Sequence, residues 1–73
     1  MREQKLLSDV LKAKRYENKH TQEKAAELLE ISARHFQDLE RGRALPGFKT
    51  ICRMAKEYNI DFAQFAENNE DAI

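Results

Sequence analysis

The segment that most constrains the fold is residues 21–43, TQEKAAELLEISARHFQDLERGR, which contains start and stop signals for two short helices. The hydroxyl of Thr21 can accept a hydrogen bond from a backbone N–H that the first turn of a helix leaves unpaired. Ser32 offers the same cap to a second helix, and Gly42 supplies a stop signal after it. The pattern predicts two short helices joined by a tight turn.

The second of these helices, predicted over residues 32–41, has two opposed faces. At about 100° per residue, Ser32, Phe36 and Leu39 fall on one side, where they can pack inward. The opposite side is polar and consists of Arg34, Gln37, Asp38 and Arg41. Such side chains can hydrogen-bond to base edges. A short helix, a tight turn and a polar-faced helix form the helix-turn-helix pattern, whose second helix lies in the major groove of DNA.

Length and composition favour a single all-α domain. A chain of 73 residues can form one hydrophobic core but not two. It has only two glycines and one proline for turns, and no run of alternating β-branched residues, so strands are not expected. Apolar spacing predicts three more helices: residues 3–17, a helix from Phe48 to Asn59, and a short one capped by Asp61. The predicted architecture is therefore five helices.

The predicted core draws on the apolar stripes of these helices. The inward-facing residues are expected to be Leu7, Val10, Leu11, Ala25, Ala26, Leu29, Phe36, Leu39, Phe48, Ile51, Met54, Ala55 and Tyr58, with Phe62 and Phe65 closing the core. Cys52, the single cysteine, is interpreted as a small core residue. Asn18 is expected to make the turn after the first helix, because asparagine tolerates the left-handed conformation.

Charge is distributed unevenly along the chain. The formal net charge is zero and the pI is 6.7, which argues mildly against a nucleic-acid partner. Residues 1–56, however, carry all 13 basic residues and a net charge of +5, whereas residues 57–73 carry −5. Phosphate binding depends on the local basic surface. We therefore predict a DNA-facing domain, residues 1–67, and an acidic tail, residues 68–73, that frays.

The motif T-Q-E-x-A-A-E-x-L-x-I-S-x-x-x-F-x-x-L-E-R-G-R-x-x-P, residues 21–46, resembles the Xre/Cro family of prokaryotic and phage helix-turn-helix regulators. The resemblance runs from about Leu6 to Phe65, most of the chain. It implies a lambda-repressor-like fold and sequence-specific binding of double-stranded DNA by a transcriptional regulator, more often a repressor. It also implies a homodimer on an inverted repeat with half-sites about one helical turn apart. Helix five, with Phe62 and Phe65, is the candidate dimer surface, although both residues can equally be core.

The resemblance implies roles for individual residues. In the family, an arginine six residues before the Thr-Gln pair often bridges a glutamate near the end of the recognition helix, and Arg15 and Glu40 stand at those positions. Gln22 matches a glutamine that contacts a phosphate and supports the recognition helix. Glu30 stands where the family usually has glycine. We therefore expect either a strained left-handed residue or a turn of another shape.

Four residues of the predicted recognition helix are candidates for reading bases. Arg34 can donate two parallel hydrogen bonds to guanine, and Gln37 can pair in the same way with adenine. His35 lies at the flank, where a phosphate or edge contact is expected. Asp38 can accept from cytosine, or it can hold Arg34 or Arg41 in place by pairing along the helix, which we prefer. The alternative for each is a solvated helix face.

The loop after this helix is a candidate for gripping the DNA backbone. Arg41, Arg43 and Lys49 lie near the predicted start of the fourth helix, whose first N–H groups form an anion site. The candidate DNA-binding residues are Gln22, Ser32, Arg34, His35, Gln37, Asp38, Arg41, Arg43 and Lys49.

Other classes of protein fit less well. His20, His35 and Cys52 lack metal-ligand spacing and there is no glycine-rich phosphate loop, so neither an enzyme nor a metal or cofactor site is expected. No apolar run approaches 18 residues, and a soluble cytoplasmic protein without a membrane partner or small-molecule effector is expected. The main alternative is a protein-interaction module, antitoxin-like or adaptor, of the same fold. RNA binding through the basic face is a third reading.

Overall fold

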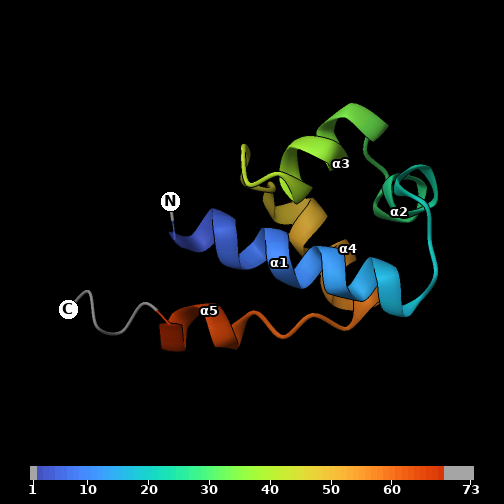
Figure 1. Cartoon of the computed structure of the whole chain (residues 1–73). Coiled ribbons are helices and arrows are strands. Elements are labelled where there is room, and N and C mark those ends of the chain that lie inside the picture. Colours follow the sequence, from blue (N-terminus) through green and yellow to red (C-terminus); the bar gives the residue numbers. More distant parts are fainter. Residues whose placement is uncertain (1, 69–73) are drawn as a thin grey trace.

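The structure is a computed structural model that describes residues 2–68. This part of the chain contains five α-helices joined by short connecting segments (Figure 1). The helices are α1 (Arg2–Glu17), α2 (Gln22–Leu29), α3 (Ala33–Glu40), α4 (Phe48–Tyr58) and α5 (Ala63–Asn68). No strand occurs within residues 2–68, and the predicted all-α, five-helix architecture is confirmed. The predicted acidic tail lies outside the described residues, apart from Asn68 at the end of α5.

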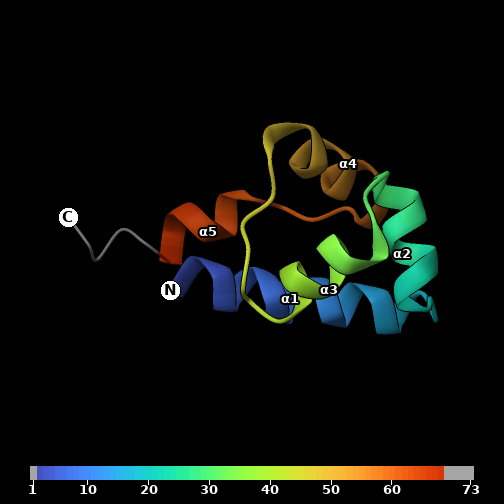
Figure 2. The ribbon, with the colours of Figure 1, turned by 90° about the horizontal axis from the view of Figure 1, so that it is seen from above.

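The core lies where α1, α2, α3 and α4 meet. α3 packs against α1 and α2, and α2 also packs against α4. Figure 1 shows α3 and α5 on opposite sides of α1, and both views place α5 beside the N-terminal half of α1 (Figure 2). The largest fully buried side chains are Phe36, Leu11, Leu29, Leu39 and Met54. Since α2 and α3 have only eight residues each, packing rather than helix propensity must hold them.

Left-handed residues end four of the helices. Lys19 follows α1 with a φ of 57°, Glu30 follows α2 with a φ of 59°, and Asn59 follows α4 with a φ of 53°. Gly42, after α3, has a φ of 73°. A side chain in this conformation costs about 1–2 kcal/mol, so only Gly42 adopts it without steric cost. Of the two shapes considered for the turn at Glu30, the structure has the left-handed one.

The predicted turn residue after α1 was wrong by one position. Asn18 was expected to be left-handed, but Lys19 takes that conformation. The reason is that two backbone N–H groups after the helix must reach carbonyls of its last turn. The Lys19 N–H donates to the Tyr16 carbonyl and the His20 N–H to the Arg15 carbonyl, each at 3.0 Å, and this requires the left-handed conformation at Lys19. The Asn18 side chain instead donates to the Lys14 carbonyl at 2.8 Å.

The sequence analysis assigned too many residues of α4 to the core. Met54 and Tyr58 are buried and Ile51 is partly buried, whereas Phe48 is 80% exposed. Ala55 is also exposed, as is Cys52, which was expected in the core. These three exposed residues share one side of the helix because they are four and three positions apart. Apolar periodicity alone did not indicate which apolar side meets the core.

The segment after α4 completes the core. Ile60, which we did not predict, is buried, and Phe62 and Phe65 are partly buried against the core, as expected. Their rings stack with centroids 5.3 Å apart. Asp61 caps the last helix, since its carboxylate accepts from the Ala63 N–H at 3.0 Å, and Gln64 donates its amide to the Asp61 carbonyl at 2.9 Å.

Candidate nucleic-acid interface

α3 is held to the body by one face and capped at its start. Phe36 and Leu39 are fully buried beneath it. The Ser32 hydroxyl accepts from the His35 N–H at 3.0 Å, the predicted cap. Ser32 itself is exposed, so its predicted inward position was wrong: the capping geometry turns it toward the open end of the helix. Figure 1 shows α3 across α1 from α5.

The outer face of α3 carries the predicted base-reading residues. The Arg34 side chain is 84% exposed, Arg41 is exposed, and His35, Gln37 and Asp38 are half-buried. Arg34 Nε lies 3.9 Å from Asp38 Oδ2, a loose pair one helical turn apart. The structure thus brings a guanidinium, an amide and a carboxylate together on a convex helix surface, where they can form hydrogen bonds with an external partner.

Glu40, at the end of the same helix, faces inward. Its carboxylate accepts hydrogen bonds from Arg15 Nε at 2.5 Å and from Arg15 Nη2 at 3.3 Å. The Glu40 side chain is only 4% exposed and the Arg15 side chain 11%. The hydrogen bond to Glu40 is the main reason that the pKa of Arg15 is raised above its ordinary value, so the guanidinium stays charged. The Ser8 hydroxyl donates to the Glu40 carbonyl. Glu40 therefore fastens α3 to α1 through both its side chain and its backbone.

Gln22 connects this ion pair to the outer face of α3. Its amide nitrogen donates to Glu40 Oε1 at 2.9 Å, and its amide oxygen accepts from Gln37 Nε2 at 3.4 Å. A chain of contacts therefore runs from Arg15 through Glu40 and Gln22 to Gln37. Because each partner fixes the next amide, Gln37 is oriented from inside the domain before any ligand arrives. That Gln22 contacts a phosphate and supports the recognition helix stays a prediction, which these two contacts favour.

The segment between α3 and α4 carries the remaining predicted contacts. Arg43 and Lys49 are exposed, and Gly47 caps α4 without a side-chain hydrogen bond, which leaves the first N–H groups of that helix free of a side-chain partner. A Cβ on Gly42 would meet the Gln4 carbonyl oxygen at an ordinary 3.6 Å. The glycine is therefore required by its positive φ and not by lack of space.

Two polar contacts that α4 makes with other parts of the domain escaped the sequence analysis. His20 Nδ1 lies 2.8 Å from the Tyr58 hydroxyl, and burial raises the pKa of Tyr58, which keeps the phenol protonated. A buried tyrosine normally finds a partner for its hydroxyl, so this need was predictable although the partner was not. The second contact is that of Arg53, which reaches from α4 to the end of α2. No local signal in the sequence indicated it.

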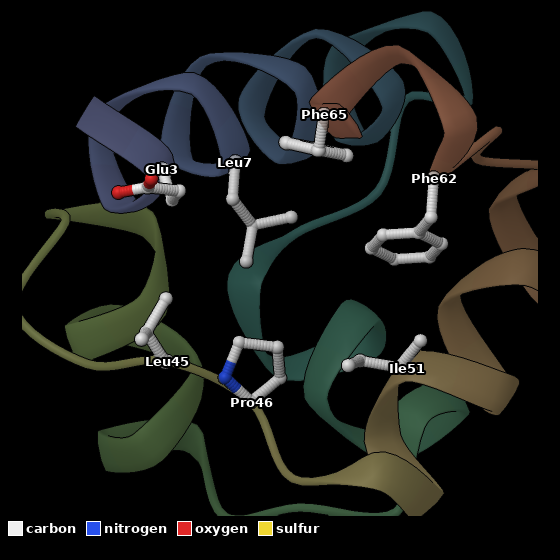
Figure 3. Close-up of a pocket in the computed structure, with 7 residues that line it drawn as sticks. All are labelled: Glu3, Leu7, Leu45, Pro46, Ile51, Phe62 and Phe65. Carbon is white, nitrogen blue, oxygen red and sulfur yellow. The ribbon is translucent and has the colours of Figure 1, made fainter. Parts of the chain in front are cut away.

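An apolar pocket lies away from these residues. It has a volume of about 220 Å³ and is lined by Glu3, Leu7, Leu45, Pro46, Ile51, Phe62 and Phe65. Figure 3 shows side chains from α1, the loop after α3, α4 and the start of α5 surrounding one space. Within residues 2–68 no group of three or more His, Cys, Asp or Glu residues could hold a metal ion. The same part of the chain has no helix long and apolar enough to cross a membrane.

The arrangement of α2, the turn and α3 is that of a helix-turn-helix domain. A family model described as helix-turn-helix matches residues 11–65, most of the chain. The chain therefore belongs to the helix-turn-helix family of the Xre and lambda-repressor type, a family of DNA-binding regulatory domains. No individual curated protein and no solved structure gives a significant match. The protein is accordingly a DNA-binding helix-turn-helix regulator.

Proposed function

We propose that the protein is a sequence-specific transcriptional repressor that reads double-stranded DNA with α3 in the major groove. The observation that carries the proposal is the exposed polar face of α3, oriented from within by the Arg15–Glu40–Gln22–Gln37 contacts. An eight-residue helix fits the width of the major groove. A face that is pre-organised in this way loses less conformational entropy on binding than a free helix would.

The side chains divide between bases and backbone. Arg34 and Gln37 are assigned to guanine and adenine edges, and His35 to the flank of the contact. Phosphates are assigned to residues at or near the ends of α2, α3 and α4, which are Gln22, Ser32, Arg41, Arg43 and Lys49. The basic residues among them explain how a chain of zero net charge can bind a polyanion, since the acidic excess lies in residues 57–73.

The proposed binding unit is a homodimer on an inverted repeat. Two copies related by a two-fold axis would place their α3 helices about 34 Å apart, in successive major grooves. Phe62 and Phe65 line the apolar pocket together with Leu45, which is 53% exposed. A two-fold interface needs one self-complementary patch, and this pocket beside an exposed leucine has that form.

Selection of bound duplexes from a random DNA pool tests the proposal. The enriched sequence is then titrated at several salt concentrations. An inverted repeat whose affinity falls steeply with salt is the expected result, because each neutralised phosphate releases counterions. No enrichment, together with weak binding that ignores salt, would contradict it.

Replacing Asp38 by alanine is expected to relax sequence preference and to raise affinity for unrelated DNA. The carboxylate repels phosphates, and its partner Arg34, 3.9 Å away, would be free to contact other bases. Competition binding between the selected duplex and a scrambled one measures both effects. Uniformly weaker binding to every duplex would instead show that Asp38 supports α3 itself.

A protein-interaction module remains the second candidate function. It is favoured by the exposed apolar side chains of Leu45, within the segment between α3 and α4, and of Phe48, the first residue of α4. A protein partner predicts association that depends weakly on salt, whereas DNA binding predicts a strong dependence.

A further inference from the structure

Arg53, in the middle of α4, makes an unusual set of contacts with the helix-turn-helix. Its Nη2 donates to the Leu28 carbonyl at 2.9 Å and lies 3.3 Å from Glu30 Oε2 and 3.5 Å from Glu57 Oε2. The side chain is 26% exposed, and its Nε is buried without a hydrogen-bond partner among residues 2–68. The guanidinium is therefore largely removed from water, and its Nε loses a hydrogen bond as a result. The contacts of Nη2 with Leu28 and Glu30 must compensate for this cost and hold the side chain in place.

The end of α2 explains what these contacts achieve. The Glu30 N–H donates to the Glu27 carbonyl at 3.1 Å and the Ile31 N–H to the Ala26 carbonyl at 3.0 Å, which pairs two of the last carbonyls of the helix. The Leu28 carbonyl belongs to the same last turn and would otherwise lack a partner within the helix. Arg53 supplies that partner and also pairs with the carboxylate of the left-handed residue.

The turn needs such support because Glu30 is not glycine. Its φ of 59° carries a steric cost that a glycine would avoid. α3 begins at Ala33, only three residues after Glu30. Any relaxation of the turn would therefore change the direction of α3. α4, by contrast, is anchored in the core through Met54 and Tyr58. Arg53 thus connects a fixed helix to the strained turn.

We propose that Arg53 is a positioning residue for DNA recognition, which clamps the left-handed turn at Glu30 and so fixes the angle of α3. The inference rests on the proposed function, since it assumes that α3 reads bases. Arg53 need not touch DNA. Glu57, four residues later on α4, lies 3.5 Å from the same Nη2 atom and completes the clamp.

The test compares four variants: Arg53→Met, Glu30→Gly, the double variant, and Lys56→Met, an exposed charge on the same helix, as control. Arg53→Met is expected to lower the ratio of specific to non-specific affinity about tenfold, or about 1.4 kcal/mol. Adding Glu30→Gly should restore the ratio to within about threefold of the original, because glycine removes the strain that the clamp opposes. Lys56→Met should leave it unchanged.

Amide hydrogen exchange supplies a readout without DNA. Exchange at Ile31 should become about tenfold faster in Arg53→Met and return toward the original rate in the double variant. The His20 amide, which closes the same kind of turn after α1, is the internal control. Arg53→Lys should be intermediate in both measurements, because one ammonium replaces the forked guanidinium.

Four results would overturn the proposal. Unchanged exchange at Ile31 would show that Arg53 does not hold the turn. Faster exchange with an unchanged affinity ratio, or no rescue by Glu30→Gly, would reduce Arg53 to a stabilising residue. A protein without any sequence preference would overturn the proposed function together with the role of Arg53 in recognition, while exchange would still decide whether the clamp exists.

Discussion

Replacing Glu40 by alanine is expected to lower the free energy of unfolding by about 3 kcal/mol. The substitution removes a carboxylate that is 4% exposed and leaves Arg15 charged and largely buried without its ion partner. The Gln22 amide loses its acceptor as well. In a domain of this size such a loss corresponds to a fall in melting temperature of about 12–24 °C, measured by circular dichroism.

Glu3→Ala is the matched control, because it removes the same side chain from a partly exposed position with no ion-pair partner among the described residues. It should change the melting temperature by no more than a few degrees. Glu40→Gln should lie between the two, since it keeps an acceptor for Arg15 and Gln22 but loses the charge. Equal melting temperatures for Glu40→Ala and Glu3→Ala would show that the ion pair does not stabilise the domain.

The helix-turn-helix was predictable because its signals are local. Thr21 and Ser32 cap helices within three residues of themselves, and Phe36 and Leu39 recur at helical spacing. The exposed side of α4 was not predictable in the same way. Phe48 is apolar and three residues before Ile51, a helical spacing, yet it lies outside the core. Periodicity identifies a helix but does not decide which of two apolar sides meets the rest of the protein.

The contacts that orient the site are mostly distant in sequence. The pairing of Arg15 with Glu40 spans 25 residues and was expected only through the family resemblance. The contact between Arg53 and Leu28, also 25 residues apart, had no such guide. Glu30 was recognisable as an unusual turn residue, but the side chain that supports it comes from another helix. Tertiary partners of this kind follow from the fold and not from the local pattern.

Replacing Arg34 by alanine is expected to weaken binding to the selected duplex about tenfold to a hundredfold. A guanidinium that donates two hydrogen bonds to guanine contributes about 1–3 kcal/mol of discrimination, and the variant loses both bonds. Binding to unrelated DNA should fall far less, because at most one phosphate contact is lost. Fluorescence anisotropy with both duplexes measures the two affinities.

The measurement can separate recognition from folding because the Arg34 side chain is 84% exposed and its only ion pair within residues 2–68, with Asp38, is a loose surface contact. The free energy of unfolding of the variant should therefore lie within about 0.5 kcal/mol of that of the original protein. Lys5→Ala is the control for the lost charge, since Lys5 is exposed on α1, outside the proposed interface. Arg34→Ala and Lys5→Ala could instead lower the affinities for the selected duplex and for unrelated DNA to the same extent. Arg34 would then be an electrostatic contact, and base reading would have to be assigned to Gln37 and the rest of the outer face of α3.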